Sequence, residues 1–178
     1  MKTTIGALLL LLSFSTIAQD KLELIDGSIF LTEFHTIKIN DQVTLGELAN
    51  IEAGHEFLNA LGPFTMDKWV DEAGRRRRKA SFDGLQASFR DQMKYPNLNV
   101  LGAQRLTITD SKFRLTLSSG LEVFTIGSKI TDSCNPGAVK LHGRKLMISS
   151  KNQTESGYQG HILLNEQDEI TETVLYFN

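Results

Sequence analysis

Residues 44–63 read TLGELANIEAGHEFLNALGP, and this stretch decides the predicted fold. Thr44 precedes Glu47 by three residues, the spacing of a capping box, in which a hydroxyl and a carboxylate each satisfy a backbone N–H at a helix start. Apolar residues then recur at intervals of three and four. The Gly-Pro pair at 62–63 ends the pattern, because glycine suits the position after a helix and proline cannot continue one. The stretch predicts one amphipathic helix at about residues 44–61.

Strand-like segments lie on both sides of this helix. Residues 22–39 alternate loosely between apolar and polar positions and predict two short strands with a turn at Asp26-Gly27-Ser28. From Lys68 onward the period is two, and the Asp83-Gly84 pair between alternating segments is the strongest short-range signal of a β-hairpin. The chain therefore predicts the α+β class, with an antiparallel sheet and one main helix (about residues 44–61) packed on one face.

The second half of the chain reads as further strands. Residues 105–108 and 112–117 predict another hairpin around Thr109-Asp110-Ser111. Residues 145–149, 160–164 and 170–177 predict the closing strands, and a polar turn joins the last two.

The first 18 residues have the pattern of a secretory signal peptide. Lys2 supplies a basic start, residues 5–12 an apolar run, and Thr16-Ile17-Ala18 a small-residue end. The apolar run is too short to cross a bilayer, which needs roughly 20 residues. We expect cleavage after Ala18, export to a periplasm or out of the cell, and no transmembrane segment after cleavage. Residues 19–178 then form a single α+β domain.

A weak internal similarity leaves a duplicated unit open. Residues 39–44 can be laid over residues 126–131, where the first, fifth and sixth positions agree in character. Two units, at about residues 37–120 and 121–178, would account for the mature chain. A domain without an internal repeat is the alternative.

Composition and motifs exclude several classes of function. The chain has 178 residues and a formal net charge of −2, so bulk charge does not draw it to nucleic acid. It has no glycine-rich phosphate loop and no Gly-x-Ser-x-Gly nucleophile elbow. Its four histidines stand singly, without the spacing that lets two share a zinc ion. We therefore expect no metal, no cofactor and no catalytic residues. The lone Cys134 reads as a small buried hydrophobic residue.

The most conspicuous feature is a run of five cations formed by Arg75, Arg76, Arg77, Arg78 and Lys79. On a strand, Arg75, Arg77 and Lys79 would share one face and the other two the opposite face. Three interpretations stay open. The run lies in a hairpin loop and an edge strand, where charge prevents edge-to-edge pairing. Alternatively, it pairs with the acids at Asp67, Asp71 and Glu72. Finally, together with Trp69, it binds a partner protein or an envelope polyanion.

A helix that ends in Leu61-Gly62-Pro63 and is followed by strands at residues 68–90 resembles a known kind of small exported domain. This is the fold of the β-lactamase inhibitor protein and of the small outer-membrane-assembly lipoproteins, in which a helical hairpin packs on an antiparallel sheet. The resemblance covers about residues 43–90. This chain lacks the spacer residue of the Leu-Gly-x-Pro motif, the second helix and the lipoprotein cysteine. The resemblance implies a non-catalytic protein-binding module whose sheet face or loops meet a partner.

These observations give a functional prediction and an alternative. The prediction is an exported, non-catalytic binding or structural module of the cell envelope, with a protein as its partner. The alternative is a small hydrolase of envelope polysaccharide or peptidoglycan that uses two of the acids near Trp69.

Overall fold

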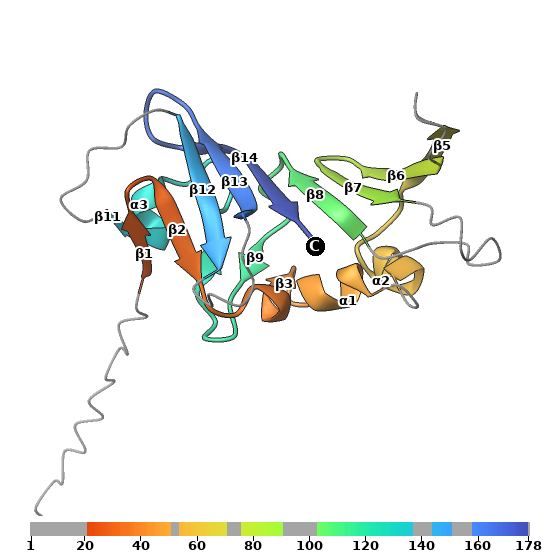
Figure 1. Cartoon of the computed structure of the whole chain (residues 1–178), viewed down its shortest axis with the longest axis horizontal. Coiled ribbons are helices and arrows are strands. Elements are labelled where there is room, and N and C mark those ends of the chain that lie inside the picture. The colour runs from red at the N-terminus through yellow and green to blue at the C-terminus, as the bar shows by residue number, and fades with distance from the viewer. Residues whose placement is uncertain are drawn as a thin grey trace, which may run out of the picture.

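The computed structural model describes residues 21–50, 54–70, 76–90, 103–136, 144–150 and 158–177. The predicted signal peptide at residues 1–18 lies outside these ranges, as do Asp71, Glu72 and Arg75. The described strands form a ten-stranded sheet and a four-stranded sheet (Figure 1). The longest described helix has seven residues. The protein is therefore built mainly of β-structure.

The large sheet has the strand order β11-β1-β2-β12-β13-β14-β8-β7-β6-β5. Its strands are β1 (Leu22–Ile25), β2 (Ser28–Leu31), β5 (Thr65–Val70), β6 (Arg76–Phe82), β7 (Leu85–Arg90), β8 (Ala103–Ile108), β11 (Cys134–Pro136), β12 (Lys145–Ser150), β13 (Tyr158–Leu164) and β14 (Ile170–Tyr176). The small sheet has the order β10-β9-β3-β4. Its strands are β3 (Lys38–Ile39), β4 (Val43–Thr44), β9 (Leu115–Thr116) and β10 (Glu122–Val123). The helices are α1 (Leu45–Ala49), α2 (Gly54–Ala60), α3 (Ile130–Ser133) and the 3-10 turn η1 (Phe34–Thr36).

The prediction of an α+β fold with one main helix on an antiparallel sheet is wrong. The large sheet is mixed, because β1 pairs parallel with β11 and β2 pairs parallel with β12. The predicted hairpin of residues 105–117 is also wrong, since β8 belongs to the large sheet and β9 to the small one. Periodicity indicates that a segment is a strand, but it carries no information about which distant strand becomes its neighbour.

The predicted helix at residues 44–61 is two short helices. Helix α1 ends at Asn50, which is extended (φ −66°, ψ 126°), and α2 begins at Gly54. Asparagine side chains favour non-helical backbone, and glycine inside a helix costs about 1 kcal/mol relative to alanine. The packing of α1 is tight, because a Cβ added at Gly46 would lie 3.0 Å from the backbone oxygen of His35. Contact with η1 therefore helps to fix where α1 runs.

The predicted capping box at the start of α1 is confirmed. The Glu47 N–H donates to the Thr44 hydroxyl at 3.1 Å, and the Thr44 N–H donates to the Glu47 carboxylate at 2.7 Å. The Thr44 hydroxyl also donates to that carboxylate at 2.8 Å. The backbone hydrogen bond from Thr44, followed by the bond from its hydroxyl, lowers the pKa of Glu47.

We expect Thr44→Ala to lower the free energy of unfolding by about 1 kcal/mol, the usual cost of losing a helix N-cap. A carboxylate whose pKa is lowered on folding stabilises the protein above its unfolded pKa, and this contribution is lost as pH falls through the folded pKa. The difference between wild type and variant should therefore narrow below about pH 4. Urea unfolding of the wild type and the variant measures the difference in their free energies of unfolding at neutral and at acidic pH. An undiminished difference in acid would show that the carboxylate has no part in the cap.

The hydrophobic core lies between the large sheet and the layer formed by the small sheet and the helices. Buried side chains from both layers belong to one hydrophobic cluster, which includes Ile39, Leu45 and Leu115 on one side and Leu106 and Ile162 on the other. Figure 1 shows α1, α2 and β3 along the same side of the large sheet. We call the opposite face of the large sheet, which faces away from this core, the outer face.

The order of elements is similar in the two halves of the chain. A short hairpin precedes a helix in each, β3–β4 before α1 and β9–β10 before α3. The strands β3 and β9 pair with each other, as do β8 and β14. The helix N-caps are Thr44 and Lys129, which stand two positions apart when residues 39–44 are laid over 126–131. The two-unit repeat stays a prediction, and the topology would give its units as residues 38–108 and 115–176.

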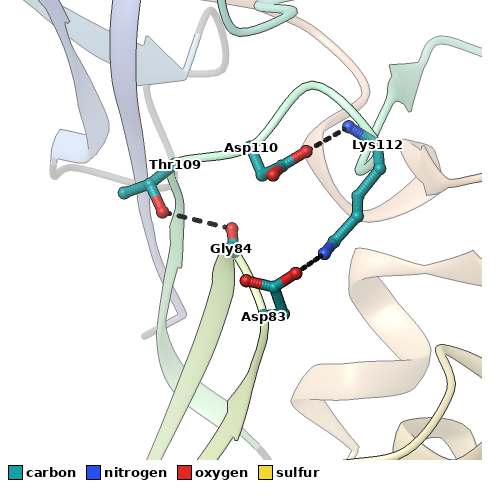
Figure 2. A network of polar contacts seen from close by, with 5 residues as sticks. All are labelled: Asp83, Gly84, Thr109, Asp110 and Lys112. Atoms are coloured by element: carbon teal, nitrogen blue, oxygen red, sulfur yellow. Dashed lines mark hydrogen bonds and ion pairs between the residues drawn. The ribbon is translucent and has the colours of Figure 1, made fainter.

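A polar network holds the β6–β7 turn against the connection that follows β8 (Figure 2). The Lys112 ammonium lies 2.5 Å from the Asp83 carboxylate, and the Lys112 N–H donates to Asp110 at 2.9 Å. The N–H of Thr109 donates to the Gly84 oxygen at 2.9 Å. This network fixes the hairpin that carries the basic run.

Candidate functional site

Alternation along the strands assigns each side chain to one face of the large sheet. On β6 and β7, Ala80, Phe82, Leu85 and Ala87 are buried and belong to the hydrophobic cluster. The residues between them therefore point to the outer face. Val174 on β14 is buried, but it lies outside that cluster, as expected for a residue of the outer face.

The basic run is divided between the two faces. Arg77 and Lys79 alternate with Ala80 and lie on the outer face, half-buried. Arg78 lies on the core side, where it is half-buried and opposite Phe89 in register. The predicted separation of neighbouring cations is confirmed for these three residues. Arg75 lies outside the described residues, and for Arg76 the structure describes the backbone alone.

The interpretation of the run as an edge strand is wrong. Strand β6 pairs with β5 on one side and with β7 on the other, so β5 forms the edge. Trp69 on β5 stands opposite Arg77 in register, although its side chain is outside the description. Asp67 stands opposite Lys79, an opposite-charge arrangement that stabilises paired strands.

Three cations come to the outer face from separate strands. Lys79 lies on β6, the exposed Arg105 on β8 and the exposed Lys145 on β12. The register places Lys79 opposite Ser88, and Ser88 opposite Arg105. The backbones of Lys79 and Arg105 are therefore two strands, or about 10 Å, apart. Within the described part of the chain, none of the three makes an ion pair or a hydrogen bond. Among the residues that the structure describes, these three charges therefore have no partner.

Three cations elsewhere in the described part of the chain have an ion-pair partner. Arg114 lies 3.8 Å from Glu122, and Arg144 lies 2.6 Å from Glu166. Lys112 has the Asp83 partner already described. In the same part of the chain, the exposed Lys38 and Lys129 lack an ion pair as well. The outer face is a candidate binding surface because three cations from separate strands, Lys79, Arg105 and Lys145, gather on one face of the sheet.

An imidazole and a phenol lie together on this face. His161 on β13 stands between Met147 and Val174 in register, and its exposed fraction is 8%. Its Nδ1 is 3.3 Å from the Tyr176 hydroxyl, and the ring centroids are 5.9 Å apart. Burial, followed by the positive charge of Lys145, lowers the pKa of His161, while Glu172 opposes this shift. Tyr176 is half-buried and directly opposite Arg105 in register.

Sequence reasoning missed Arg105, Lys145, His161 and Tyr176. Alternation with buried Leu106 and Leu146 would have assigned Arg105 and Lys145 to the polar faces of their strands. No local signal could bring those strands together, because β8 and β12 are joined through β14 and β13, which come last in the sequence.

The prediction that Cys134 is buried is confirmed, since its exposed fraction is 1%. Burial raises the pKa of the thiol to about 12, and Lys21 opposes the shift slightly. Because the thiolate is the reactive form, we expect iodoacetamide to leave the native protein unmodified at neutral pH. The same reagent should modify one thiol after unfolding in urea. Rapid modification of the native protein, detected by mass spectrometry, would contradict the buried position.

The described residues contain no group of three or more histidine, cysteine, aspartate and glutamate side chains placed to hold a metal ion. Across the same residues, no helix has the length and apolar character needed to cross a membrane.

Comparisons with protein families, with curated proteins and with solved structures found no match for this chain.

Proposed function

We propose that the protein is an exported, non-catalytic binding module of the cell envelope that docks an acidic surface of another protein on its outer face. The observation that carries this proposal is the set of three cations, Lys79, Arg105 and Lys145, which reach one face from three strands without a partner among the described residues. Complementary charge at an interface steers encounter and selects the partner.

A protein suits this face better than a polyanion. Asp67 and Glu172 lie on the outer face among the cations, where they would weaken the binding of a sulfated or phosphorylated polymer but not exclude it. A protein surface of mixed charge matches this face better. Met147, Leu163 and Tyr176 are half-buried on the same face and offer apolar and aromatic area. Protein interfaces combine such side chains with charge, and they favour tyrosine, methionine and arginine. Nucleic acid is disfavoured by the net charge of −2.

The hydrolase alternative rests on Asp67, Asp71 and Glu72. Asp67 is exposed at the edge strand and opposite Lys79. The other two acids lie outside the described residues, so this alternative stays a prediction.

The test compares two triple variants with the same change in charge. The first replaces Lys79, Arg105 and Lys145 by serine on the outer face. The second replaces Lys38, Arg114 and Lys129 by serine, which are exposed on the small-sheet side. Each purified protein is used to capture crosslinked partners from the envelope fraction of its own host, at low and high salt.

The proposal predicts one stoichiometric protein that is lost from the outer-face variant, kept by the small-sheet variant and weakened by salt. Equal capture by both variants would contradict docking on the outer face. Capture of a polysaccharide in place of a protein would overturn the choice of partner.

Export has its own test. We expect the protein purified from the exported fraction of its host to begin at Gln19, as shown by N-terminal sequencing. A chain that keeps Met1 and stays with the cytoplasmic fraction would contradict export.

A further inference from the structure

The outer face carries a titratable pair that the docking of an acidic surface does not by itself explain. His161 and Tyr176 are in hydrogen-bond contact, with 3.3 Å between Nδ1 and the hydroxyl oxygen. His161 is almost inaccessible, whereas Tyr176 is half-buried and next to the exposed Arg105. The Tyr176 hydroxyl lies toward β13, where it contacts His161, and Arg105 stands opposite Tyr176 on the other neighbouring strand, β8. A ligand on the outer face over β14 would meet both groups.

Charged groups surround His161 from each neighbouring strand. Lys145 comes from β12, Glu172 and the Tyr176 phenol from β14, and Arg105 from β8. Two of these charges are positive and one is negative, so an anion beside Arg105 would restore the balance. Burial and the positive charges lower the pKa of His161, which keeps the free protein's imidazole neutral at physiological pH.

The protonation of His161 decides what the Tyr176 hydroxyl can offer. When Nδ1 carries no proton, it accepts a hydrogen bond, and the hydroxyl donates its proton inward. When the imidazole is a cation, both ring nitrogens are donors, so Nδ1–H donates to the hydroxyl oxygen. The hydroxyl proton is then free to point to solvent and to donate to an anion.

Building on the proposed docking function, we infer that Tyr176 and Arg105 form a carboxylate subsite of the outer face and that His161 couples its occupation to uptake of one proton. Arg105 supplies the planar donor pair that matches a carboxylate. Tyr176 supplies a third donor. His161 is a positioning residue that turns this donor outward. Binding of an acidic partner should therefore strengthen as the pH falls.

The test uses poly-L-glutamate as a defined acidic polypeptide and follows the ring signals of His161 by NMR. The signals are assigned by their loss in His161→Gln, because the chain has four histidines. We expect the polymer to raise the pKa of His161. By linkage, a rise of one unit makes binding about tenfold tighter to the protonated protein than to the neutral one. Glutamate side chains stay largely ionised down to about pH 5.5, so the probe itself does not titrate in this window.

Two variants separate positioning from charge. Tyr176→Phe should keep salt-dependent binding but reduce the rise in the His161 pKa, because the link through the phenol oxygen is lost and only the direct effect of the bound charge remains. His161→Gln should keep binding and lose its pH dependence between about pH 8 and pH 5.5. If His161 had only a structural role, the pH dependence of binding would be the same in His161→Gln as in the wild type.

The outcomes distinguish this inference from the proposed function. If poly-L-glutamate binds and the outer-face serine variant abolishes binding, but the His161 titration does not move, the subsite is wrong and the docking face stands. If the polymer fails to bind, or binds that variant equally well, both are wrong. If heparin raises the His161 pKa and poly-L-glutamate does not, the ligand is a sulfated polymer and the carboxylate assignment is overturned.

Discussion

Replacing Lys79, Arg105 and Lys145 together by glutamate is expected to weaken the complex with the captured partner by about 100-fold. Each reversal removes an attraction and adds a repulsion worth about 1 kcal/mol near a protein surface, and about 3 kcal/mol corresponds to that ratio. The effect should shrink at high salt, because exposed charges are screened. Kd values measured by isothermal titration calorimetry in low and high salt give both results.

Arg78→Glu is the matched control, because it makes the same kind of change in the same strand on the core side. Arg78 is half-buried opposite Phe89, so its replacement should lower stability while leaving the Kd nearly unchanged. The methylene groups of an arginine contribute packing as well as charge. If Arg78→Glu weakened binding as much as Lys79→Glu does, net charge rather than a defined face would control the complex.

One added methyl group at Gly84, in the turn shown in Figure 2, is expected to cause a large loss of stability. Gly84 has a φ of +86°, and a Cβ built there would overlap the Cβ of Asp110 and lie 3.1 Å from its Cγ. Gly84→Ala combines the cost of left-handed backbone, about 1 kcal/mol, with an overpacking cost of about 2 kcal/mol. Urea unfolding should therefore show a loss of about 3 kcal/mol.

Gly127 separates these two costs. Its φ is +85°, and nothing lies within 4 Å of the position of an added Cβ. Gly127→Ala should therefore show the backbone cost alone, about 1 kcal/mol. Removing the opposing Cβ by Asp110→Gly should recover part of the loss in Gly84→Ala. Equal losses at Gly84 and Gly127 would show that the β6–β7 turn is not held against the residues that follow β8.

Local features of this fold could be predicted from the sequence. The capping box at Thr44 and the hairpin at Asp83-Gly84 are confirmed, because both depend on side chains within a few residues of each other. The first hairpin is confirmed as β1 and β2, with positive φ at Asp26 and Gly27. The closing strands at residues 145–149, 160–164 and 170–177 are confirmed as β12, β13 and β14, with ends that differ by one or two residues.

The arrangement of these elements could not be predicted. Strand β12 pairs with β2 across more than 100 residues of sequence, and this parallel contact makes the large sheet mixed. The helix at residues 44–61 looked continuous because its apolar spacing continued through Asn50 and Gly54. The interruption follows the extended backbone at Asn50, a local preference that the apolar spacing does not report.

The candidate site was predictable only in part. Alternation was sufficient to separate Arg77 and Lys79 from Arg78 once the run was taken as a strand. The positions of the other residues of the candidate site depend on strand order, which places Tyr176 beside Arg105 and His161 beside Val174. A run of five cations attracts attention in the sequence, but only part of the run, joined by Arg105 and Lys145 from distant strands, forms the proposed docking surface.

The most direct test of the outer face as the docking surface is covalent labelling of lysines by acetic anhydride, with and without the captured partner. Lys79 and Lys145 lie on the outer face, whereas the exposed Lys38 and Lys129 lie on the small-sheet side. The docking proposal predicts that the partner protects Lys79 and Lys145 and leaves the labelling of Lys38 and Lys129 unchanged. Protection of Lys38 and Lys129 with continued labelling of Lys79 and Lys145 would contradict it.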